Sequence, residues 1–381
     1  MPILSSLWSL GLYIVPFVGV LSLIVFFHEF GHFLVGRLCG VRVDAFSLGF
    51  GPELFAFVDR YGTRWRVAAL PLGGYVKFHG DANGASMADP EAIAAMPPEE
   101  RAVSFFGQNV WKRAAIVVAG PVANFILAIL LFTGIFYVNG RNILLPYVDG
   151  VAAGSAAEAA GFKAGDLILS IDGAPIDSFE AMQRIVQTTR DHSLTFTVAR
   201  DGKQIELSAT PRVRDIVTPL GTTRVGVLGV EAKGRPENWR VENYGLLQSA
   251  RLAVSETWYV VARTGDYVAG LFSGTESTSQ MSGVVGIAQA SGEMAKIGLS
   301  AVLHLAAILS ISVGILNLLP IPLLDGGHLF FYTIEAVRGR ALDERVQQFG
   351  FRIGMTLVAG LMILATYNDV LRLTRQLLHW G

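Results

Sequence analysis

Long segments without charged residues constrain this chain more than any other feature. The segment 7–27 has no charged residue and is long enough to cross the hydrocarbon core of a membrane, which is about 30 Å thick. Segments 114–138 and 299–319 have the same character, and 353–371 is a shorter fourth candidate. Charged residues make up 16% of the chain, against roughly 25% in soluble domains. The sequence therefore predicts an α-helical polytopic membrane protein with about four transmembrane helices.

Composition also limits the partners and the metal chemistry. The formal net charge is −1, so the chain has no overall attraction for polyanions, and we expect no nucleic-acid partner. Cys39 is the only cysteine, which excludes an internal disulfide and a cysteine-rich zinc site. Any metal ligands must therefore come from His, Asp and Glu.

A further apolar stretch, 254–272, carries Arg263 and Asp266 near its middle. We interpret it as an amphipathic helix on the membrane surface, and a fifth transmembrane helix is the alternative. Lys and Arg residues flank the membrane segments within 37–113 and 329–352, so the positive-inside rule places these two loops in the cytoplasm. Both termini and the long middle segment are then expected on the opposite side.

The loop 37–113 is expected to contain β structure. Its four β-prone runs are Val41–Phe50, Leu54–Asp59, Arg64–Leu70 and Tyr75–His79. Glycine- and proline-containing turn signals separate these runs. They predict a small sheet or a pair of hairpins, associated with the membrane on the cytoplasmic side.

The segment 145–213 has the pattern of a compact α/β module. The expected elements are a strand at Leu167–Ile171, a helix at Ser178–Thr188, and a hairpin of Leu194–Arg200 with Gln204–Ala209. Together with the run Gly-Phe-x-x-Gly-Asp-x-Ile-x-x-Ile-Asp-Gly that starts at Gly161, this order resembles a permuted PDZ domain of bacterial proteases. The run occurs once, so we expect one PDZ domain, followed by a linker at 214–298 with amphipathic membrane-surface helices.

The first apolar segment ends in a pattern that suggests metal chemistry, His28-Glu29-Phe30-Gly31-His32. Residues at positions i and i+4 of a helix share one face, so both imidazoles can reach one zinc ion, with Glu29 beside them as a candidate general base. A pair of buried polar residues in a helix interface is the alternative. Ionisable groups at membrane depth are costly without a partner, and this favours a bound metal.

Catalytic zinc usually has three protein ligands, so the His pair needs a third. The best candidate is Asp325, which follows a helix break at Pro320 and Pro322 and precedes two glycines. The alternative is that Asp325 only caps a following helix, which would begin near Leu329. His328 is either a partner of a ligand or simply part of the first turn of that helix.

These two motifs together resemble the site-2 protease family of intramembrane zinc metalloproteases, and within it the bacterial regulator-of-sigma-E protease type. Further similarity lies in Pro71-Leu-Gly-Gly-Tyr-Val-Lys77, Val110-Trp-Lys-Arg-Ala-Ala115, Gly120-Pro-Val-Ala-Asn124 and Met281-Ser-Gly-Val-Val-Gly-Ile287. The resemblance implies a zinc ion (Zn2+) bound by His28, His32 and Asp325. It also implies that Glu29 is the catalytic acid/base and that Asn317 contacts substrate.

The resemblance further implies regulated intramembrane proteolysis in the bacterial inner membrane, with the PDZ domain on the periplasmic side. The expected substrate is a single-pass transmembrane protein, such as an anti-sigma factor, that an upstream site-1 protease has trimmed on its periplasmic side. The peptide bond hydrolysed would lie in or near its transmembrane segment, within the lipid bilayer. The segment Gly73–Phe78 is the expected sheet edge for an unwound substrate, with Gly74 and Tyr75 as substrate-binding residues, and an ordinary loop hairpin is the alternative.

The predicted organisation has transmembrane helices in 1–36, 114–138, 299–328 and 353–371, cytoplasmic-side segments in 37–113 and 329–352, the PDZ domain in 145–213, and the periplasmic linker in 214–298. A non-enzymatic membrane scaffold that uses its PDZ domain to bind protein tails is the alternative function. A metal-coupled transporter is a weaker one, because four spans without an internal repeat make a poor transport pathway. The intact Glu29 between the two His residues argues against the scaffold.

Overall fold

The computed structural model describes residues 2–81, 95–189, 192–218, 221–274, 281–340 and 342–378. They form two compact units, which we describe one after the other. The first unit comprises Met1–Ile135, Leu247–Val268 and Ser282–Gly381, and the second comprises Phe136–Leu246 and Ala269–Met281.

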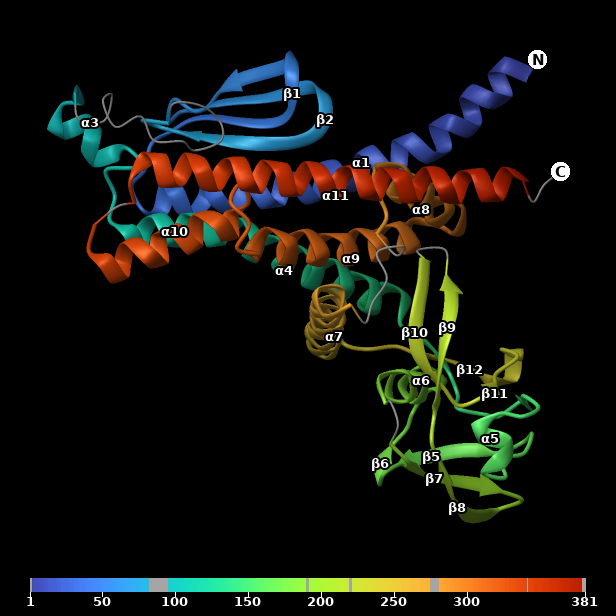
Figure 1. Ribbon diagram of the computed structural model, residues 1–381. Coiled ribbons are helices and arrows are strands. Elements are labelled where there is room, and N and C mark those ends of the chain that lie inside the picture. The colour runs from blue at the N-terminus through green and yellow to red at the C-terminus, as the bar shows by residue number, and fades with distance from the viewer. Residues whose placement is uncertain are drawn as a thin grey trace. The chain divides into compact units, whose positions relative to one another are not determined.

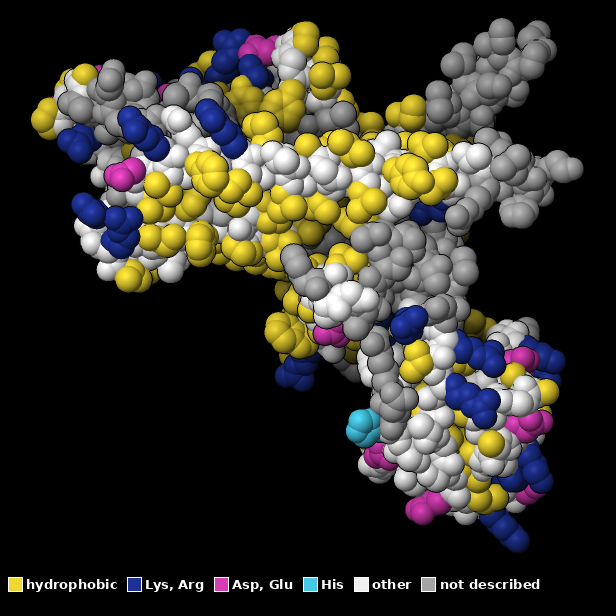
Figure 2. All heavy atoms as spheres, in the orientation of Figure 1, with side chains coloured by type: hydrophobic (Ala, Val, Ile, Leu, Met, Phe, Trp, Pro, Cys, Tyr) yellow, Lys and Arg dark blue, Asp and Glu magenta, His cyan; other side chains and the backbone are white. Residues whose placement is uncertain are grey.

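The first unit is built on helices that are long and apolar enough to cross a membrane. The described residues contain four of them: α1 (Pro2–Leu38), α4 (Val110–Asn139), α9 (Leu299–Leu318) and α11 (Glu344–Leu378). In Figure 1, the axes of α9 and α11 lie nearly parallel to that of α1, and the chain runs along α11 in the direction opposite to α1. Hydrophobic side chains cover the visible face of α9 and α11 in Figure 2. By length and composition, the expected number of spanning helices is confirmed.

The apolar stretch at 254–272 lies within α7 (Leu246–Ser273), which is not one of these four helices. One side of α7 exposes Leu247, Val254 and Trp258, whereas Ala253 is fully buried. What favours the interpretation as a surface helix over that of a fifth span is that α7, with Arg263 and Asp266 in it, is not apolar enough to count as a candidate span.

The chain breaks between α9 and the next helix, α10 (Asp325–Arg338). Pro320 and Pro322 interrupt the helical hydrogen bonds, and Leu323 has a φ of 117°, which is rare for a residue with a side chain. The prediction that the next helix begins near Leu329 is wrong, because Asp325 is already its first residue. The predicted cytoplasmic loop 329–352 is therefore largely helical, with the end of α10 and the start of α11 in it.

A small antiparallel sheet of β1 (Val43–Val58) and β2 (Arg64–Phe78) follows α1. Each strand is used twice, because Ser47 pairs with Tyr75 on one side and with Arg66 on the other. The two strands thus give four rows, in the order 74–78, 43–48, 64–67 and 53–58. The prediction of a small sheet from four β-prone runs is confirmed. Within the described residues, the row 74–78 has a paired neighbour on one side only.

Aromatic side chains fix this sheet to α1. Phe46 stacks on Trp65 with ring centroids 4.4 Å apart, and both rings contact Phe33 of α1. Phe78 stacks on Phe105, which lies between α3 (Pro98–Val103) and α4. Large buried rings contribute much of the packing energy in such an interface, so the row 74–78 is held firmly beside α1.

The helix α8 (Val284–Ile297) ties α1 to α11. At its start, the backbone N–H of Gly286 donates to Oδ2 of Asp369 at 2.8 Å, and Asp369 is also paired with Arg372. Near its end, Nζ of Lys296 donates to the hydroxyl of Tyr13 at 2.9 Å. The bundle is therefore braced by polar contacts at both ends of α8.

The second unit is an α/β module with more strands than the sequence predicts. Its elements are β3 (Arg141–Leu144), β4 (Gly150–Val151), α5 (Ala156–Ala159), β5 (Leu167–Ile171), β6 (Ala174–Pro175), α6 (Phe179–Thr188), β7 (Leu194–Arg200), β8 (Lys203–Ala209), β9 (Arg212–Thr218), β10 (Gly221–Val227), β11 (Val230–Glu231), the short 3-10 helix η1 (Pro236–Asn238) and β12 (Trp239–Glu242). The elements predicted between Leu167 and Ala209 are all present, with ends that agree within a residue.

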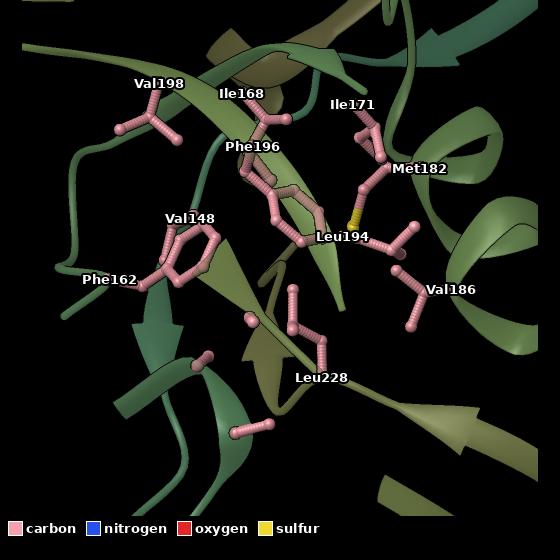
Figure 3. Close-up of a cluster of buried hydrophobic side chains, with 13 residues drawn as sticks. Val148, Phe162, Ile168, Ile171, Met182, Val186, Leu194, Phe196, Val198 and Leu228 are labelled. Atoms are coloured by element: carbon pink, nitrogen blue, oxygen red, sulfur yellow. The ribbon is translucent and has the colours of Figure 1, made fainter. Parts of the chain in front are cut away.

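Local sequence explains why these elements form where they do. The hydroxyl of Ser178 accepts a hydrogen bond from the backbone N–H of Ala181 and caps α6. Asp172 and Gly173 both have positive φ, as a two-residue hairpin turn between β5 and β6 requires. Four strands pair in the order β6-β5-β7-β8, and Figure 3 shows how Phe196 and Phe162 meet in the buried core beside this sheet.

The predicted boundary of this module at residue 213 is wrong. The strand β11 pairs with β4, and β12 pairs with β3, so the chain returns to the start of the module after residue 213. Leu228 belongs to the same buried core (Figure 3). The predicted linker 214–298 is therefore strand-rich up to Glu242, and only α7 and α8 remain of it as helices. The strands β4 and β11 are only two residues long and carry little local signal, and the longer β9, β10 and β12 were not predicted either.

Candidate metal centre

The two histidines of the first motif share one face of α1, as their spacing predicts. Their Nε2 atoms are 3.3 Å apart, and their rings meet edge to face with centroids 4.8 Å apart. The helix continues beyond them to Leu38, so the pair lies within the candidate span Gly11–Leu38 rather than at its end. Both side chains are largely buried, with 13% and 11% of their surface exposed.

Asp325 joins this pair from the far end of the chain. Its Oδ2 atom lies 3.2 Å from Nε2 of His28 and 3.5 Å from Nε2 of His32. Asp325 is not the N-cap of α10, a position that Leu324 holds without a side-chain hydrogen bond. The alternative in which Asp325 only caps the helix therefore does not describe the geometry.

The donor set fits a zinc ion. Zinc binds imidazole nitrogen and carboxylate oxygen at about 2.0–2.2 Å, so tetrahedral donors lie roughly 3.3–3.6 Å apart. The three separations here are 3.2, 3.3 and 3.5 Å. Oδ2 of Asp325 is also buried without a well-formed hydrogen bond from any described residue, which is costly unless a cation is bound there. Among the described residues, this is the one group of three such side chains close enough to hold a metal.

The remaining ring nitrogens of both histidines face α4. Nδ1 of His32 lies 2.9 Å from the backbone oxygen of Ile116, and Nδ1 of His28 lies 3.2 Å from Nδ2 of Asn124. Gly120 lies between these two residues of α4, and a Cβ atom on it would approach Nε2 of His32 to 2.3 Å. The close approach of the rings to α4 therefore requires glycine at this position.

A cavity of about 220 Å³ opens on these donors. Its lining includes all seven residues to which the sequence analysis assigned a role in zinc binding, catalysis or substrate binding: His28, Glu29, His32, Gly74, Tyr75, Asn317 and Asp325. His328 also lines it, with its ring 5.4 Å from that of Phe351, but it is not part of the donor group. Residues from α1, the sheet, the end of α9 and the start of α10 thus meet in one cavity.

Glu29 lies between the donors and the sheet row 74–78. The backbone N–H of Val76 interacts with its carboxylate, and a Cβ atom on Gly74 would lie 3.0 Å from Cγ of Glu29. The side chain of Tyr75 is held by Phe50 and by Arg66, whose guanidinium lies 5.0 Å from the ring centre. The carboxylate of Glu29 thus lies directly beside the row 74–78.

A salt bridge holds α10 against α4 near the centre. Arg113 pairs with Glu335 at 2.5 Å, and its guanidinium lies 4.8 Å from the ring centre of Tyr332. Tyr332 is buried and lines the cavity. These contacts connect α10, the helix that begins with Asp325, to α4, the helix that carries Gly120.

A second polar anchor holds the sheet to the end of α1. Asp59 accepts hydrogen bonds from Arg37 at 2.6 Å and from Nε1 of Trp65 at 3.0 Å. Burial alone would raise the pKa of Asp59, but these hydrogen bonds, with those from the backbone of Thr63 and Tyr61, lower it to about 2. Asp59 is therefore ionised at neutral pH and bonded to α1.

Sequence reasoning missed the contributions of Asn124, Ser310 and Glu335 to this centre. Asn124 is fully buried in α4, and its backbone oxygen accepts a hydrogen bond from Oγ of Ser310 at 2.9 Å. The available signal was an amide in the middle of an otherwise apolar span, because polar groups at membrane depth are costly and usually have a role.

Comparison with known proteins gives matches over nearly the whole chain. Residues 16–361 match peptidase family M50. A protein of Agrobacterium fabrum that carries the name of a zinc metalloprotease is 48% identical over 94% of this chain and 95% of its own length. Metalloprotease MmpA of Caulobacter vibrioides is 40% identical over 94% of this chain and 95% of its own length.

A more distant relative is the regulator of sigma E protease of Salmonella typhi, which is 32% identical over 97% of this chain and 100% of its own length. That alignment runs over 467 positions, although this chain has 381 residues. The Salmonella protein therefore carries sequence that has no counterpart here.

Proposed function

This chain belongs to peptidase family M50, the site-2 protease family of zinc metalloproteases, and we propose that it cleaves a single-pass membrane protein in or near its transmembrane segment. The observation that carries this proposal is the cluster of two imidazoles and one carboxylate around a common point, beside Glu29. The imidazoles and Glu29 lie in α1, which is apolar enough to span a membrane, and the carboxylate of Asp325 follows the break after α9, a second such helix. A zinc metalloprotease that cleaves at membrane depth requires its metal site at that depth.

In this proposal His28, His32 and Asp325 hold the zinc ion, and Glu29 is the catalytic acid/base. Bound zinc supplies a Lewis acid that activates water and polarises the scissile carbonyl. The Glu29 carboxylate takes the proton of the attacking water and passes it to the leaving amine as the peptide C–N bond breaks. The contact between Glu29 and the backbone N–H of Val76 orients the carboxylate for this transfer.

The substrate is held as an extended strand along the row 74–78, whose outer side has no paired neighbour among the described residues. A transmembrane helix hides its carbonyl groups in its own hydrogen bonds, so it must unwind before cleavage, and pairing with a sheet edge replaces those bonds. Gly74 and Tyr75 contact the extended peptide, and Asn317, which lines the same cavity at the end of α9, contacts it as well. The absence of a side chain on Gly74 lets the row itself lie close to Glu29, because a Cβ atom there would lie 3.0 Å from Cγ of Glu29.

The α/β module of the second unit acts as a single PDZ domain on the periplasmic side of a bacterial inner membrane. Its helix α6 and the hairpin of β7 and β8, which follow β5 in the expected order, support the assignment as a PDZ domain. The proposed substrate has first been trimmed on its periplasmic side by a site-1 protease, as an anti-sigma factor would be. Because the chain belongs to a family of metalloproteases, the alternative of a non-enzymatic scaffold is disfavoured.

The test is cleavage by the purified protein in detergent or in vesicles, with its zinc content measured in the same samples. We expect cleavage of a trimmed single-pass protein within its hydrophobic segment, and no cleavage by the Glu29→Gln variant. A zinc-loaded protein that cuts soluble polypeptides but leaves every single-pass substrate intact would contradict the proposed substrate class. A protein that binds no zinc would contradict the proposed site.

A further inference from the structure

The side chain of Asn124 is the one amide that meets the candidate metal centre from α4. It is fully buried, and its Nδ2 atom lies 3.2 Å from Nδ1 of His28. Its Oδ1 atom is buried as well, and no described residue donates a hydrogen bond to it. The side chain therefore has one end against His28 and an acceptor that lacks a donor.

The chemistry of a metal-binding imidazole decides which end should face His28. A neutral imidazole that binds a metal through Nε2 carries its proton on Nδ1, and this N–H needs an acceptor. For His32 the acceptor is the backbone oxygen of Ile116, at 2.9 Å. For His28 the group at that position is the Asn124 amide, whose oxygen can accept but whose nitrogen cannot.

The two ends of an amide have nearly the same shape, so their assignment depends on the hydrogen bonds that they make. Turning the Asn124 amide by half a turn places Oδ1 where Nδ2 lies. This one change gives the N–H of His28 its acceptor and gives the buried oxygen its donor. Both requirements point to the same orientation.

We propose that Asn124 is a positioning residue: its Oδ1 accepts a hydrogen bond from Nδ1–H of His28, and this bond keeps Nε2 of His28 directed at Asp325 and the metal. The proposal rests on the proposed role of His28 as a zinc ligand. Asn124 is itself held in place, because Oγ of Ser310 donates to its backbone oxygen at 2.9 Å and joins α9 to α4 at this point. Gly120, one turn earlier on α4, leaves the space that the two rings occupy.

The test compares zinc retention in four purified variants after timed exposure to a chelator. Asn124→Leu has a similar size and removes the acceptor, and we expect it to lose zinc about 10- to 100-fold more readily than the unaltered protein. Asn124→Asp offers an oxygen in either orientation and should retain zinc. Thr133→Val is the matched control, because it removes a hydroxyl from the same helix. That hydroxyl donates to the backbone oxygen of Ile129, one turn earlier in α4, and not to a residue of the metal centre. His28→Ala should lose zinc outright.

The outcomes distinguish the role of Asn124 from the role of His28 as a zinc ligand. Unaltered zinc retention in Asn124→Leu, with loss in His28→Ala, would overturn the role of Asn124 and leave the zinc site standing. Full retention in His28→Ala would overturn the zinc site itself. If Asn124→Leu does not insert and fold, nitrogen NMR of the histidine rings in the unaltered zinc-bound protein decides. We expect a proton on Nδ1 of His28, and an unprotonated Nδ1 would refute the inference.

Discussion

The carboxylate of Asp325 approaches the imidazole of His28 to 3.2 Å, although the two residues come from opposite ends of the chain. The break between α9 and α10 makes this possible, because it starts a new helix at Asp325 rather than continuing α9 past the centre. Leu323, two residues earlier, takes a backbone conformation that is unfavourable for a residue with a side chain. The unfavourable backbone conformation of Leu323 is thus part of the chain break that places the carboxylate of Asp325.

Replacement of Asp325 should therefore remove the third zinc ligand and leave the membrane helices intact. We expect Asp325→Asn to weaken zinc binding and to reduce proteolysis by at least about 100-fold. Asp325→Glu should keep part of the zinc but little activity, because one added methylene moves the carboxylate by about an ångström, a shift to which catalysis is sensitive. Zinc per chain and cleavage rate, measured on the same preparation, check both expectations. Full zinc and full activity in Asp325→Ala would place the third ligand elsewhere, with His328 as the first candidate.

Glu29→Gln should separate chemistry from metal binding. Glu29 lies beside the donors without being one of them, so the variant should bind one zinc ion per chain. Loss of a general acid/base costs about 10²- to 10⁴-fold in rate, so cleavage should fall to near background. The measurement is the single-turnover rate on a trimmed substrate, with zinc determined in parallel. Turnover at the rate of the unaltered protein would show that another group carries the proton.

The sequence predicts those parts of this centre that depend on periodicity. The spacing of His28 and His32 places both on one face of any helix, and the helix break at Pro320 and Pro322 marks Asp325 as a displayed charge. Contacts between helices have no such period. Nothing in the sequence pairs Asn124 with His28 or Arg113 with Glu335, because those contacts depend on how α4 packs on α1 and α10.

The β structure shows the same difference between features that local sequence determines and contacts between distant segments. Turn residues and alternating hydrophobicity locate β5, β7 and β8 to within a residue, because local sequence determines a hairpin. The double use of β1 and β2 was not predictable, since it depends on where two long strands bend. The pairings of β11 with β4 and of β12 with β3 join segments far apart in the sequence, so the predicted end of the module was too early.

The pair Arg113 and Glu335 provides a test of the link between α10 and the zinc site. Breaking a buried ion pair leaves a charge without compensation, so Glu335→Leu alone should destabilise the protein by roughly 3 kcal/mol and weaken zinc binding through Asp325. Replacing both, as Arg113→Met with Glu335→Leu, should recover much of the stability. Thermal unfolding in detergent and zinc retention are the two measurements.

The control for this experiment is the ion pair of Glu293 with Lys296, whose side chains are 56% and 48% exposed. Its loss in Glu293→Gln should change stability by at most about 1 kcal/mol, as for other surface pairs. If Glu335→Leu has no greater effect than Glu293→Gln, and zinc retention does not change, then the Arg113 bridge does not position α10.

Asp59 should give the anchor of the sheet a dependence on acidic pH. Its pKa is lowered to about 2 in the folded protein, against about 3.9 for an unperturbed aspartate. A lowered pKa stabilises the folded state fully above the unfolded value, and this contribution is lost as the pH falls from about 4 towards 2. Asp59→Asn should therefore be less stable than the unaltered protein at neutral pH, and the difference should shrink below pH 4. Thermal unfolding from pH 6 to pH 2.5 checks this, and a difference that grows on acidification would contradict it.

Removal of the α/β module should leave cleavage intact and relax the choice of substrate. The strands β3 and β12 are neighbours in the module, with Leu144 opposite Trp239, so residues 145–238 can be replaced by a two-residue turn that closes a hairpin. A deletion of 148–212 would be less suitable, because it would remove β4, the pairing partner of β11, and would separate Leu228 from the buried core of the module. If the module excludes untrimmed proteins, the shortened enzyme should cut full-length and trimmed substrate at rates within a few-fold of each other. The same replacement with Glu29→Gln controls for contaminating proteases, and zinc content verifies that the centre is intact. A shortened enzyme that binds zinc and cuts trimmed substrate, yet still rejects the full-length protein, would show that selection lies in the membrane part of the chain.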